Sequence, residues 1–190
     1  VLSEEGFGDQ PTDLSGKVWI VDPIDGTMNF VLQHRNFAIM AARYVDGKPD
    51  RAYILNVMND ELCHGIVGHG VFLNDTQLST PKDRSLQEGL MAVNVYMITH
   101  FPPLAKVAMT ARGVRMYGSA GLEMMGVLTG RLSGYISHLR PWDLAAGRVL
   151  ATELGLSVQS IDGASLSVLS SNNVIVGTKK VNQDVMKIIH

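Results

Sequence analysis

The first 75 residues of the chain contain a series of short apolar segments separated by turn signals. Asp46-Gly47, Asn59-Asp60 and Asn74-Asp75 are two-residue signals of the kind found in hairpin loops. They help to divide apolar runs at 18–21, 37–45, 52–57, 61–67 and 71–73. Because runs of this length are typical of strands, this part of the chain is predicted to form an antiparallel meander.

The second part of the chain alternates between helical and strand-like segments. We expect strands over 91–96, 135–136 and 174–176, and helices over 103–110, 119–128 and 142–154 and from Asn182 onward. The helix over 142–154 has the clearest boundaries, because Pro141 precedes it, Asp143 lies in its first turn and Gly155 follows it. Since apolar strands and apolar helix faces both need covering, we predict a mixed α/β fold built as a layered sandwich.

Length and composition exclude several other classes of protein. A chain of 190 residues fits a single domain, with the meander half at about 1–110 and the alternating α/β half at about 111–190. The 16 Lys and Arg residues nearly balance the 18 Asp and Glu residues, which excludes a generally basic nucleic-acid binder and a disordered acidic tail. This overall balance does not exclude a local basic groove.

Cysteine usage and hydropathy bear on location. Cys63 is the only cysteine, which excludes a disulfide framework and a cysteine-based zinc site, and favours a reducing cytoplasm. We expect it to be a small buried hydrophobe. The longest apolar stretch, 89–99, is far short of the roughly 20 residues that cross a bilayer, and the acidic start does not resemble a signal peptide. Because the chain opens without Met, on what looks like the end of a strand, we expect the natural protein to begin upstream.

The segment 19–30 carries the most informative chemistry. An apolar strand ends at Asp22-Pro23, where the proline is expected to stop further strand pairing. Asp25 follows three residues after Asp22, so a turn can bring both carboxylates to one side. Gly26-Thr27 then offers close backbone approach, a hydroxyl and an N–H group at a predicted helix start. Such a corner suits Mg²⁺, which prefers oxygen ligands and shares them with phosphate.

Three other interpretations compete for this segment. An Asp-Gly pair often only marks a turn, and Asp-Pro often only ends a strand. An EF-hand loop needs acids at alternate positions and a glutamate at the twelfth, which this segment lacks. A haloacid-dehalogenase phosphatase carries Asp-x-Asp-Gly-Thr after a strand, but that alignment places Ile24 at the nucleophilic aspartate. Because isoleucine cannot attack phosphorus, the spacing excludes that class.

Two further acidic segments extend the pattern, Ser3-Glu4-Glu5-Gly6 and Trp142-Asp143. Each is weak alone, since paired glutamates are typical of a solvated face and an aspartate in a first helical turn stabilises the helix dipole without any metal. Together with Asp22 and Asp25, they supply the roughly four or five oxygen ligands that a pair of Mg²⁺ ions requires. The sequence therefore predicts a two-metal site.

In these blocks the sequence resembles the inositol monophosphatase family, whose members are Mg²⁺-dependent, lithium-sensitive phosphomonoesterases, and it is similar to the bacterial members. The resemblance runs from Leu2-Ser3-Glu4-Glu5 through 19–30 to 141–147, in the family's order, and so covers essentially the whole chain. It implies an αβαβα sandwich of the sugar-phosphatase type. It also implies hydrolysis of a small phosphate monoester, in the first place inositol 1-phosphate to inositol and phosphate.

The resemblance implies metal-ligand roles at matching positions. Glu4, Asp22 and the Ile24 carbonyl would hold one Mg²⁺ ion. Asp22, Asp25 and Asp143 would hold a second, with Asp22 bridging the two, and a third, weaker ion would depend on Glu4. A metal-activated water would attack phosphorus in line, with no covalent enzyme intermediate.

The resemblance also implies substrate contacts. The backbone N–H groups of Gly26 and Thr27 would bind the phosphate, and the Thr27 hydroxyl would orient the attacking water, so that Thr27, like the ligands Glu4 and Asp22, is a predicted catalytic residue. Gly118-Ser119-Ala120 would line the sugar side of the pocket, where Asp25 and Asp143 are also expected to contact substrate.

The chain departs from the family pattern in three places. The family's N-terminal helical segment, with a lysine and the aspartate that activates Thr27, is absent, and Ser3 stands in place of a glycine. The stretch 135–140 lacks the acid that binds substrate hydroxyls in inositol-specific members. Within it, His138 and Arg140 either attract a second anionic group, such as another phosphate on a sugar bisphosphate or NADP, or Arg140 pairs with a structural carboxylate.

Several functions stay open at this point. Inositol 1-phosphate leads as substrate over NADP and fructose 1,6-bisphosphate, with a 3′-phosphonucleotide behind them. A catalytically silent binding or regulatory subunit is the alternative of another class. The resemblance suggests a homodimer, with neither nucleic acid nor membrane as partner. The remaining polar candidates are expected to be surface or packing residues: His34, His64, His69, His100, His190 and Lys179-Lys180.

Overall fold

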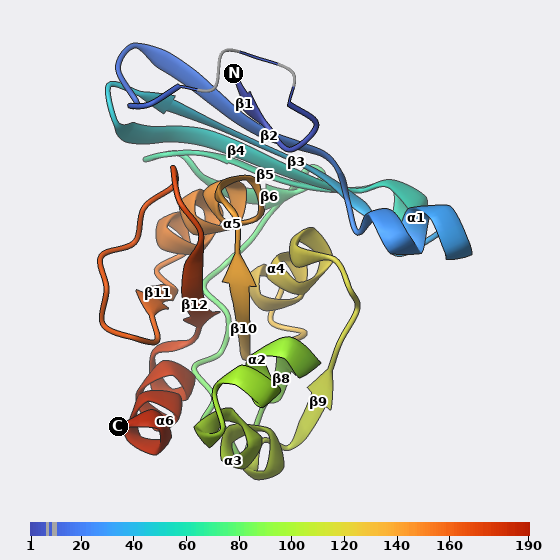
Figure 1. Ribbon diagram of the computed structural model, residues 1–190. Helices are drawn as coiled ribbons and strands as arrows, with labels where there is room; N and C mark the ends of the chain where they lie inside the picture. Colours follow the sequence, from blue (N-terminus) through green and yellow to red (C-terminus); the bar gives the residue numbers. More distant parts are fainter. Residues whose placement is uncertain (7, 9–10) are drawn as a thin grey trace.

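The protein is described by a computed structural model that covers residues 1–6, 8 and 11–190. The described strands form two sheets (Figure 1). The first sheet has seven strands in chain order, with β1 parallel to β2 and every later pair antiparallel. Its strands are β1 (Leu2–Ser3), β2 (Lys17–Asp25), β3 (Ala38–Val45), β4 (Lys48–Asn56), β5 (Glu61–Ile66), β6 (Gly70–Leu73) and β7 (Thr76–Gln77). The predicted antiparallel meander is confirmed.

The second sheet has five strands in the order β11-β12-β10-β8-β9. They are β8 (Leu90–Val93), β9 (Gly113–Arg115), β10 (Gly134–Leu139), β11 (Ser157–Ser160) and β12 (Asn172–Gly177). The chain passes from one sheet to the other between β7 and β8, ahead of the expected division near residue 110. The physical reason is that β8 pairs in parallel with both β10 and β9, and so belongs to the second sheet.

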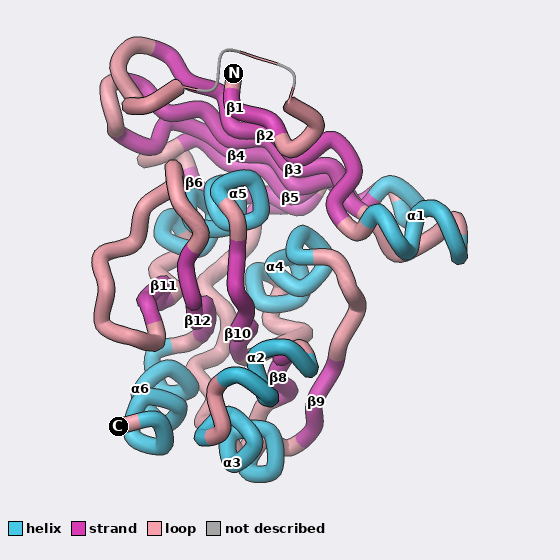
Figure 2. The backbone as a smooth tube through the Cα atoms, in the orientation of Figure 1, coloured by secondary structure: helices cyan, strands magenta, loops and turns pink. Residues whose placement is uncertain are grey.

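The helices form two layers around the second sheet (Figures 1 and 2). α4 (Ala120–Leu128) and α5 (Pro141–Glu153) lie between the two sheets and share one hydrophobic core with both of them. α2 (Val95–His100), α3 (Pro103–Thr110) and α6 (Lys179–Ile189) cover the opposite face of the second sheet in a second core. The seven-residue α1 (Thr27–Gln33) extends from the end of the first sheet. The predicted mixed α/β layered sandwich is confirmed.

Two strand boundaries differ from expectation. Pro23 does not end β2, because the strand bulges between Asp22 and Asp25 and then pairs Asp25 with Ala38. A bulge accommodates proline, which has no N–H to donate, without ending the strand. The strand expected over 91–96 stops at Val93, because the Asn94 side chain accepts the N–H of Met97 at 2.8 Å and caps α2.

Other elements were predicted incompletely. The expected strands at 135–136 and 174–176 are the centres of the six-residue strands β10 and β12, and α6 begins at Lys179 rather than Asn182. β9 and β11 were not predicted, since they are short and lack an apolar run. Cys63 is fully buried in β5 as expected, and burial raises the pKa of its thiol to about 12. In the described part of the chain, no helix has the length and apolar character to cross a membrane.

Candidate active site

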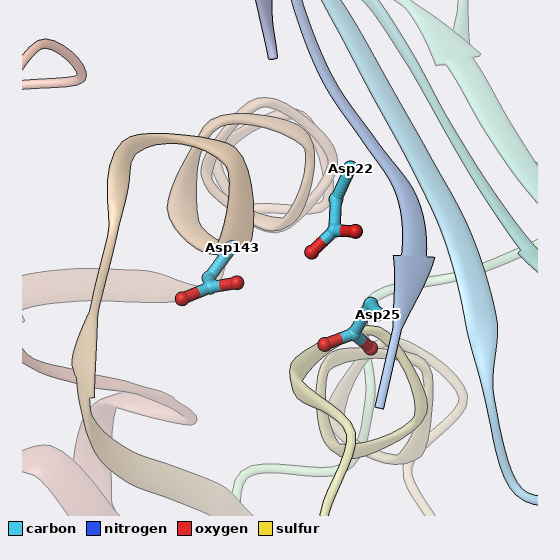
Figure 3. A group of neighbouring side chains, drawn as sticks. All are labelled: Asp22, Asp25 and Asp143. Atoms are coloured by element: carbon cyan, nitrogen blue, oxygen red, sulfur yellow. The ribbon is translucent and has the colours of Figure 1, made fainter. Parts of the chain in front are cut away.

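Three aspartates from two distant segments of the chain lie close together (Figure 3). One carboxylate oxygen from each of Asp22, Asp25 and Asp143 lies within 4.8 Å of the others. Asp22 and Asp25 lie at the end of β2, and Asp143 lies in the first turn of α5. The structure thus brings together the two aspartates of the predicted loop and the aspartate of the later block.

Asp22 lies where β2 bulges, and its side chain is only 1 % exposed. Its Oδ1 accepts the N–H of Ile24 at 3.0 Å, which fixes the carboxylate against its own loop. Burial, followed by repulsion from Asp25, Glu4 and Asp143, raises the pKa of Asp22 to about 8. An ionised Asp22 therefore needs a cation nearby.

Asp25 is bound by the beginning of α4. The Ser119 hydroxyl and the Gly121 N–H donate to Oδ2, the latter at 2.8 Å, and the Ala120 N–H donates to Oδ1 at 3.0 Å. Burial raises the pKa of Asp25, and these three hydrogen bonds oppose the rise because they favour the charged form. Asp25 is accordingly the most firmly oriented carboxylate of the three.

Asp143 is oriented by the start of its own helix. Its Oδ2 accepts the N–H of Arg140, the residue before α5, at 2.9 Å. This bond stabilises the helix start, as expected of an acid in the first turn. Burial raises the pKa of Asp143 to about 6, with further contributions from Asp25 and Glu4.

The donor set fits a hard divalent cation. All three side chains offer carboxylate oxygens, which Mg²⁺ prefers over nitrogen or sulfur ligands. Burial is the largest cause of their raised pKa values, and repulsion between the neighbouring carboxylates adds to it. A bound divalent ion would offset this cost of ionising the cluster. Asp22, Asp25 and Asp143 are therefore residues that can hold a metal ion.

Glu4 lies beside the cluster but outside the group of three. Its backbone N–H donates to Val21 in β2 at 3.3 Å, and its charge raises the pKa of Asp22. Its Oε1 lies 3.6 Å from the Arg140 guanidinium, in an ion pair whose side chains are 29 % and 60 % exposed. Arg140 therefore pairs with a carboxylate, but this carboxylate is a predicted metal ligand and not the structural carboxylate that was expected. The role of Glu4 as a metal ligand stays a prediction.

The loop after the two aspartates turns tightly against the loop before α4. Gly26 has φ 88°, and a Cβ there would lie 3.1 Å from the Ser119 Cβ, so both the conformation and the space favour glycine. The Thr27 hydroxyl donates to the Ile24 carbonyl at 3.1 Å. Asn29 donates to the carbonyls of Tyr117 and Gly118 and so holds α1 against the loop before α4.

A cavity of about 260 Å³ opens beside Asp25 and Asp143. Gly118, Ser119 and Ala120 line this cavity, and the Ser119 hydroxyl and the Ala120 N–H bind Asp25. Their contact with the sugar side of a substrate stays a prediction. Several lining residues were missed because they lie on elements distant in sequence, and no local motif marks them. They include Asn94, Met116 and Glu123, whereas Tyr135, Ser137 and His138 belong to the stretch 135–140, which was predicted to lie near the substrate.

Glu123 is the missed residue with the most unusual environment. It is 4 % exposed, its Oε1 accepts the Tyr117 N–H at 2.7 Å, and its Oε2 has no hydrogen-bond partner among the described residues. Burial raises the pKa of Glu123 to about 7, against the hydrogen bonds from Tyr117 and Gly118. It therefore supports the loop ahead of Ser119 from a site close to the aspartates.

Comparison with known proteins identifies this arrangement. The sequence matches the inositol monophosphatase family over residues 1–190. The chain belongs to the inositol monophosphatase family. It is thus a phosphatase that hydrolyses phosphate esters of small molecules, and the predicted family resemblance is confirmed.

Individual family members are similar along most of the chain. Inositol-1-monophosphatase of Bacillus subtilis is 39 % identical over 193 residues, which cover 98 % of this chain and 73 % of that protein. The Nus factor SuhB of Escherichia coli K12 is 30 % identical, covering 95 % and 70 %. The fructose-1,6-bisphosphatase/inositol-1-monophosphatase of Thermotoga maritima is 27 % identical, covering 100 % and 73 %.

Solved structures of the family share the fold. Inositol monophosphatase-II of Staphylococcus aureus superimposes with a TM-score of 0.94 at 35 % identity, covering 100 % of this chain and 76 % of that one. That enzyme has also been solved with inositol monophosphate and with 2′AMP bound. An inositol monophosphatase/NADP phosphatase solved with Mg²⁺ and phosphate superimposes with a TM-score of 0.90 at 28 % identity, covering 98 % and 71 %.

Proposed function

We propose that the protein is a Mg²⁺-dependent phosphomonoesterase that hydrolyses inositol 1-phosphate to inositol and phosphate. The observation that carries the proposal is the convergence of Asp22, Asp25 and Asp143 beside a cavity large enough for a phosphorylated polyol. The Bacillus relative is named for this activity, and the Staphylococcus aureus enzyme has been solved with inositol monophosphate. We also propose a cytoplasmic location, which the single cysteine favours. The family resemblance further implies that the active form is a homodimer and that lithium inhibits it.

The carboxylates would hold the metal ions. Asp22, Asp25 and Asp143 would hold one ion, and Asp22 with Glu4 and the Ile24 carbonyl a second, with a weaker third ion dependent on Glu4. When bound, Mg²⁺ neutralises charge on the transferring phosphoryl group and lowers the pKa of water. The raised pKa values of Asp22 and Asp143 support this assignment, because a bound cation would stabilise the ionised form of these carboxylates.

The loop after Asp25 would position the phosphate and the attacking water. The N–H groups of Gly26 and Thr27 begin α1, where backbone donors favour an anion. Because the Thr27 hydroxyl donates its proton to the Ile24 carbonyl, its oxygen is left to accept a hydrogen bond from water. Thr27 would thereby orient the water towards phosphorus. The water's oxygen would form the new P–O bond as the bond to the ester oxygen breaks, and the proton that the water loses would balance the one that the leaving alcohol gains.

The alcohol portion of the substrate would occupy the cavity. Ser119 and the N–H groups of Ala120 and Gly121 hold Asp25 at its edge, so that Asp25 and Asp143 face the substrate from fixed positions. Glu123 supplies a buried carboxylate near this part of the pocket, where 135–140 has none. Such a polar lining suits an alcohol with several hydroxyl groups.

Two other substrates share this chemistry. An inositol monophosphatase/NADP phosphatase and a fructose-1,6-bisphosphatase/inositol-1-monophosphatase are among the relatives, so NADP and fructose 1,6-bisphosphate are the second candidates. Pairing of Arg140 with Glu4 weakens the case for a second phosphate at Arg140. A silent binding subunit is disfavoured because a buried cluster of carboxylates is costly without a cation.

A substrate panel tests the proposal. Phosphate release would be measured at saturating Mg²⁺ with inositol 1-phosphate, NADP, fructose 1,6-bisphosphate and 3′-phosphoadenosine 5′-phosphate, and with Asp22→Asn as control. We expect inositol 1-phosphate to rank first and the variant to be inactive on all four. Substantial activity of Asp22→Asn would refute the metal-site assignment. Inactivity of the unaltered protein on every ester would contradict the proposal and favour a catalytically silent binding or regulatory subunit.

A further inference from the structure

His138 is held in the cavity wall by the strand beside it. It lies on β10 directly opposite Asn173 on β12, and it lines the same cavity as Asp143. Its Nδ1 lies 2.8 Å from the Asn173 Oδ1, within hydrogen-bond distance. The ring also lies near Tyr96 of α2, with centroids 6.2 Å apart. An exposed histidine with one nitrogen bound in this way has a defined orientation.

The orientation of the Asn173 amide determines which nitrogen of His138 carries the proton. Asn173 Nδ2 donates to Asp162 Oδ2 at 3.1 Å, and Asp162 also accepts from the Ser160 hydroxyl and the Ala164 N–H. These hydrogen bonds, the one from Ser160 first, hold the pKa of Asp162 below its usual range, so its carboxylate is acceptor-only. The amide N–H₂ must therefore face Asp162, and the amide oxygen must face His138.

An oxygen acceptor at Nδ1 requires a proton on that nitrogen. In the neutral imidazole the other nitrogen, Nε2, is then a hydrogen-bond acceptor. Nε2 has no partner among the described residues, whereas the Asn94 side chain, which lines the same cavity, has partners for both its oxygen and its nitrogen. Asn94 uses Oδ1 to cap α2 and Nδ2 to donate to Ser137 Oγ at 3.1 Å.

We propose that His138 is a specificity-determining residue whose Nε2 accepts a hydrogen bond from a hydroxyl group on the alcohol portion of the substrate. Asn173 and Asp162 are its positioning residues, which fix the ring and its tautomer. This inference rests on the proposed function, and it names the kind of alcohol that the site prefers. The preferred phosphate ester has an alcohol portion that bears a further hydroxyl group within reach of β10. An ester with an apolar alcohol portion lacks this contact.

A matched pair of esters tests the contact. Cyclohexyl phosphate has the ring and phosphate of inositol 1-phosphate without its other hydroxyl groups. Loss of one neutral hydrogen bond should lower kcat/KM of His138→Ala for inositol 1-phosphate about three- to tenfold, mainly through KM, and leave cyclohexyl phosphate within about twofold. His100→Ala is the matched control, because His100 stacks on the same Tyr96 but does not line the cavity.

A spectroscopic measurement tests the positioning chain without reference to activity. In protein carrying ¹⁵N-histidine, the neutral His138 ring should show the Nδ1–H tautomer, and Asn173→Ala should populate the Nε2–H tautomer and reproduce the loss on inositol 1-phosphate. An Nε2–H tautomer in the unaltered protein, an equal loss on both esters, or no loss on either would overturn the inference. Inactivity of the unaltered protein on both esters, with Nδ1–H intact, would overturn the proposed function instead.

Discussion

The Ser119 hydroxyl donates to the Asp25 carboxylate and at the same time accepts the Leu122 N–H at 3.3 Å as the N-cap of α4. One side chain thus begins a helix and orients a carboxylate of the candidate metal site. Because α4 also packs between the two sheets, the position of Asp25 depends on the same core that holds the sheets together. The metal site and the fold are therefore coupled at this residue.

Ser119→Ala should lower both stability and metal affinity. Loss of the cap costs about 1 kcal/mol of unfolding free energy, and Asp25 loses its hydroxyl donor as well. Chemical denaturation and Mg²⁺ titration of the same preparation would measure the two effects. Ser165→Ala, at an exposed loop position, is the control and should change neither quantity. Unchanged Mg²⁺ affinity in Ser119→Ala would show that Asp25 does not need this bond.

Gly121→Ala should shift the Asp25 carboxylate, because the added methyl group on α4 would crowd it. A Cβ at this position would lie 2.8 Å from the Ala38 Cβ and 3.1 Å from Asp25 Oδ2. Overpacking of this kind costs about 1–3 kcal/mol, and we expect a lowered Tm together with weaker Mg²⁺ binding. Gly113→Ala is a matched control, since the added methyl group there meets only the ends of flexible side chains. Equal behaviour of the two variants would contradict the account.

Glu123→Gln should stabilise the protein increasingly as pH rises. The pKa of Glu123 is raised from 4.5 to about 7 by burial, so its contribution to stability is complete below pH 4.5 and is lost as pH rises through 7. Glutamine keeps an acceptor for the Tyr117 N–H and carries no charge to bury. The Tm of the variant relative to the unaltered protein should therefore be higher at pH 8 than at pH 5. A difference that is flat across this range would show that Glu123 does not titrate there.

Arg140→Gln should release the Glu4 carboxylate from its ion pair with Arg140. The ion pair between them is largely exposed, so its loss should change the unfolding free energy by less than about 1 kcal/mol. If Glu4 is a metal ligand, removal of its competing cation should raise Mg²⁺ affinity, as measured by calorimetry. Arg131→Gln removes a similar exposed pair with Glu61 at 3.5 Å and should leave Mg²⁺ affinity unchanged. Lower affinity in Arg140→Gln would count against the ligand role of Glu4.

The sequence indicated the main elements of the site because its chemistry is concentrated in short segments. Asp22 and Asp25 lie three residues apart on a strand end, and Asp143 follows a proline at a helix start. Apolar runs and turn pairs likewise indicated the meander. These are local patterns, and local patterns survive in the fold wherever packing agrees with them.

Contacts between distant elements could not be inferred in this way. No pattern near Asn94 or Glu123 shows that β8 and α4 bring them to one cavity, and nothing in 135–140 shows that Asn173 holds His138. Pro23 was expected to end a strand, but the bulge that accommodates it depends on pairing with β3. Such features arise from tertiary pairing, which a single sequence does not specify locally.

The central claim is that the buried aspartates form a Mg²⁺ site on which phosphate-ester hydrolysis depends. The most direct test is phosphate release from inositol 1-phosphate as Mg²⁺ is added back to metal-stripped protein, compared with Asp22→Asn and with the exposed control Asp75→Asn. The account predicts saturable activation in the unaltered protein and in Asp75→Asn, and none in Asp22→Asn. Hydrolysis that is independent of Mg²⁺, or that persists in Asp22→Asn, would contradict it.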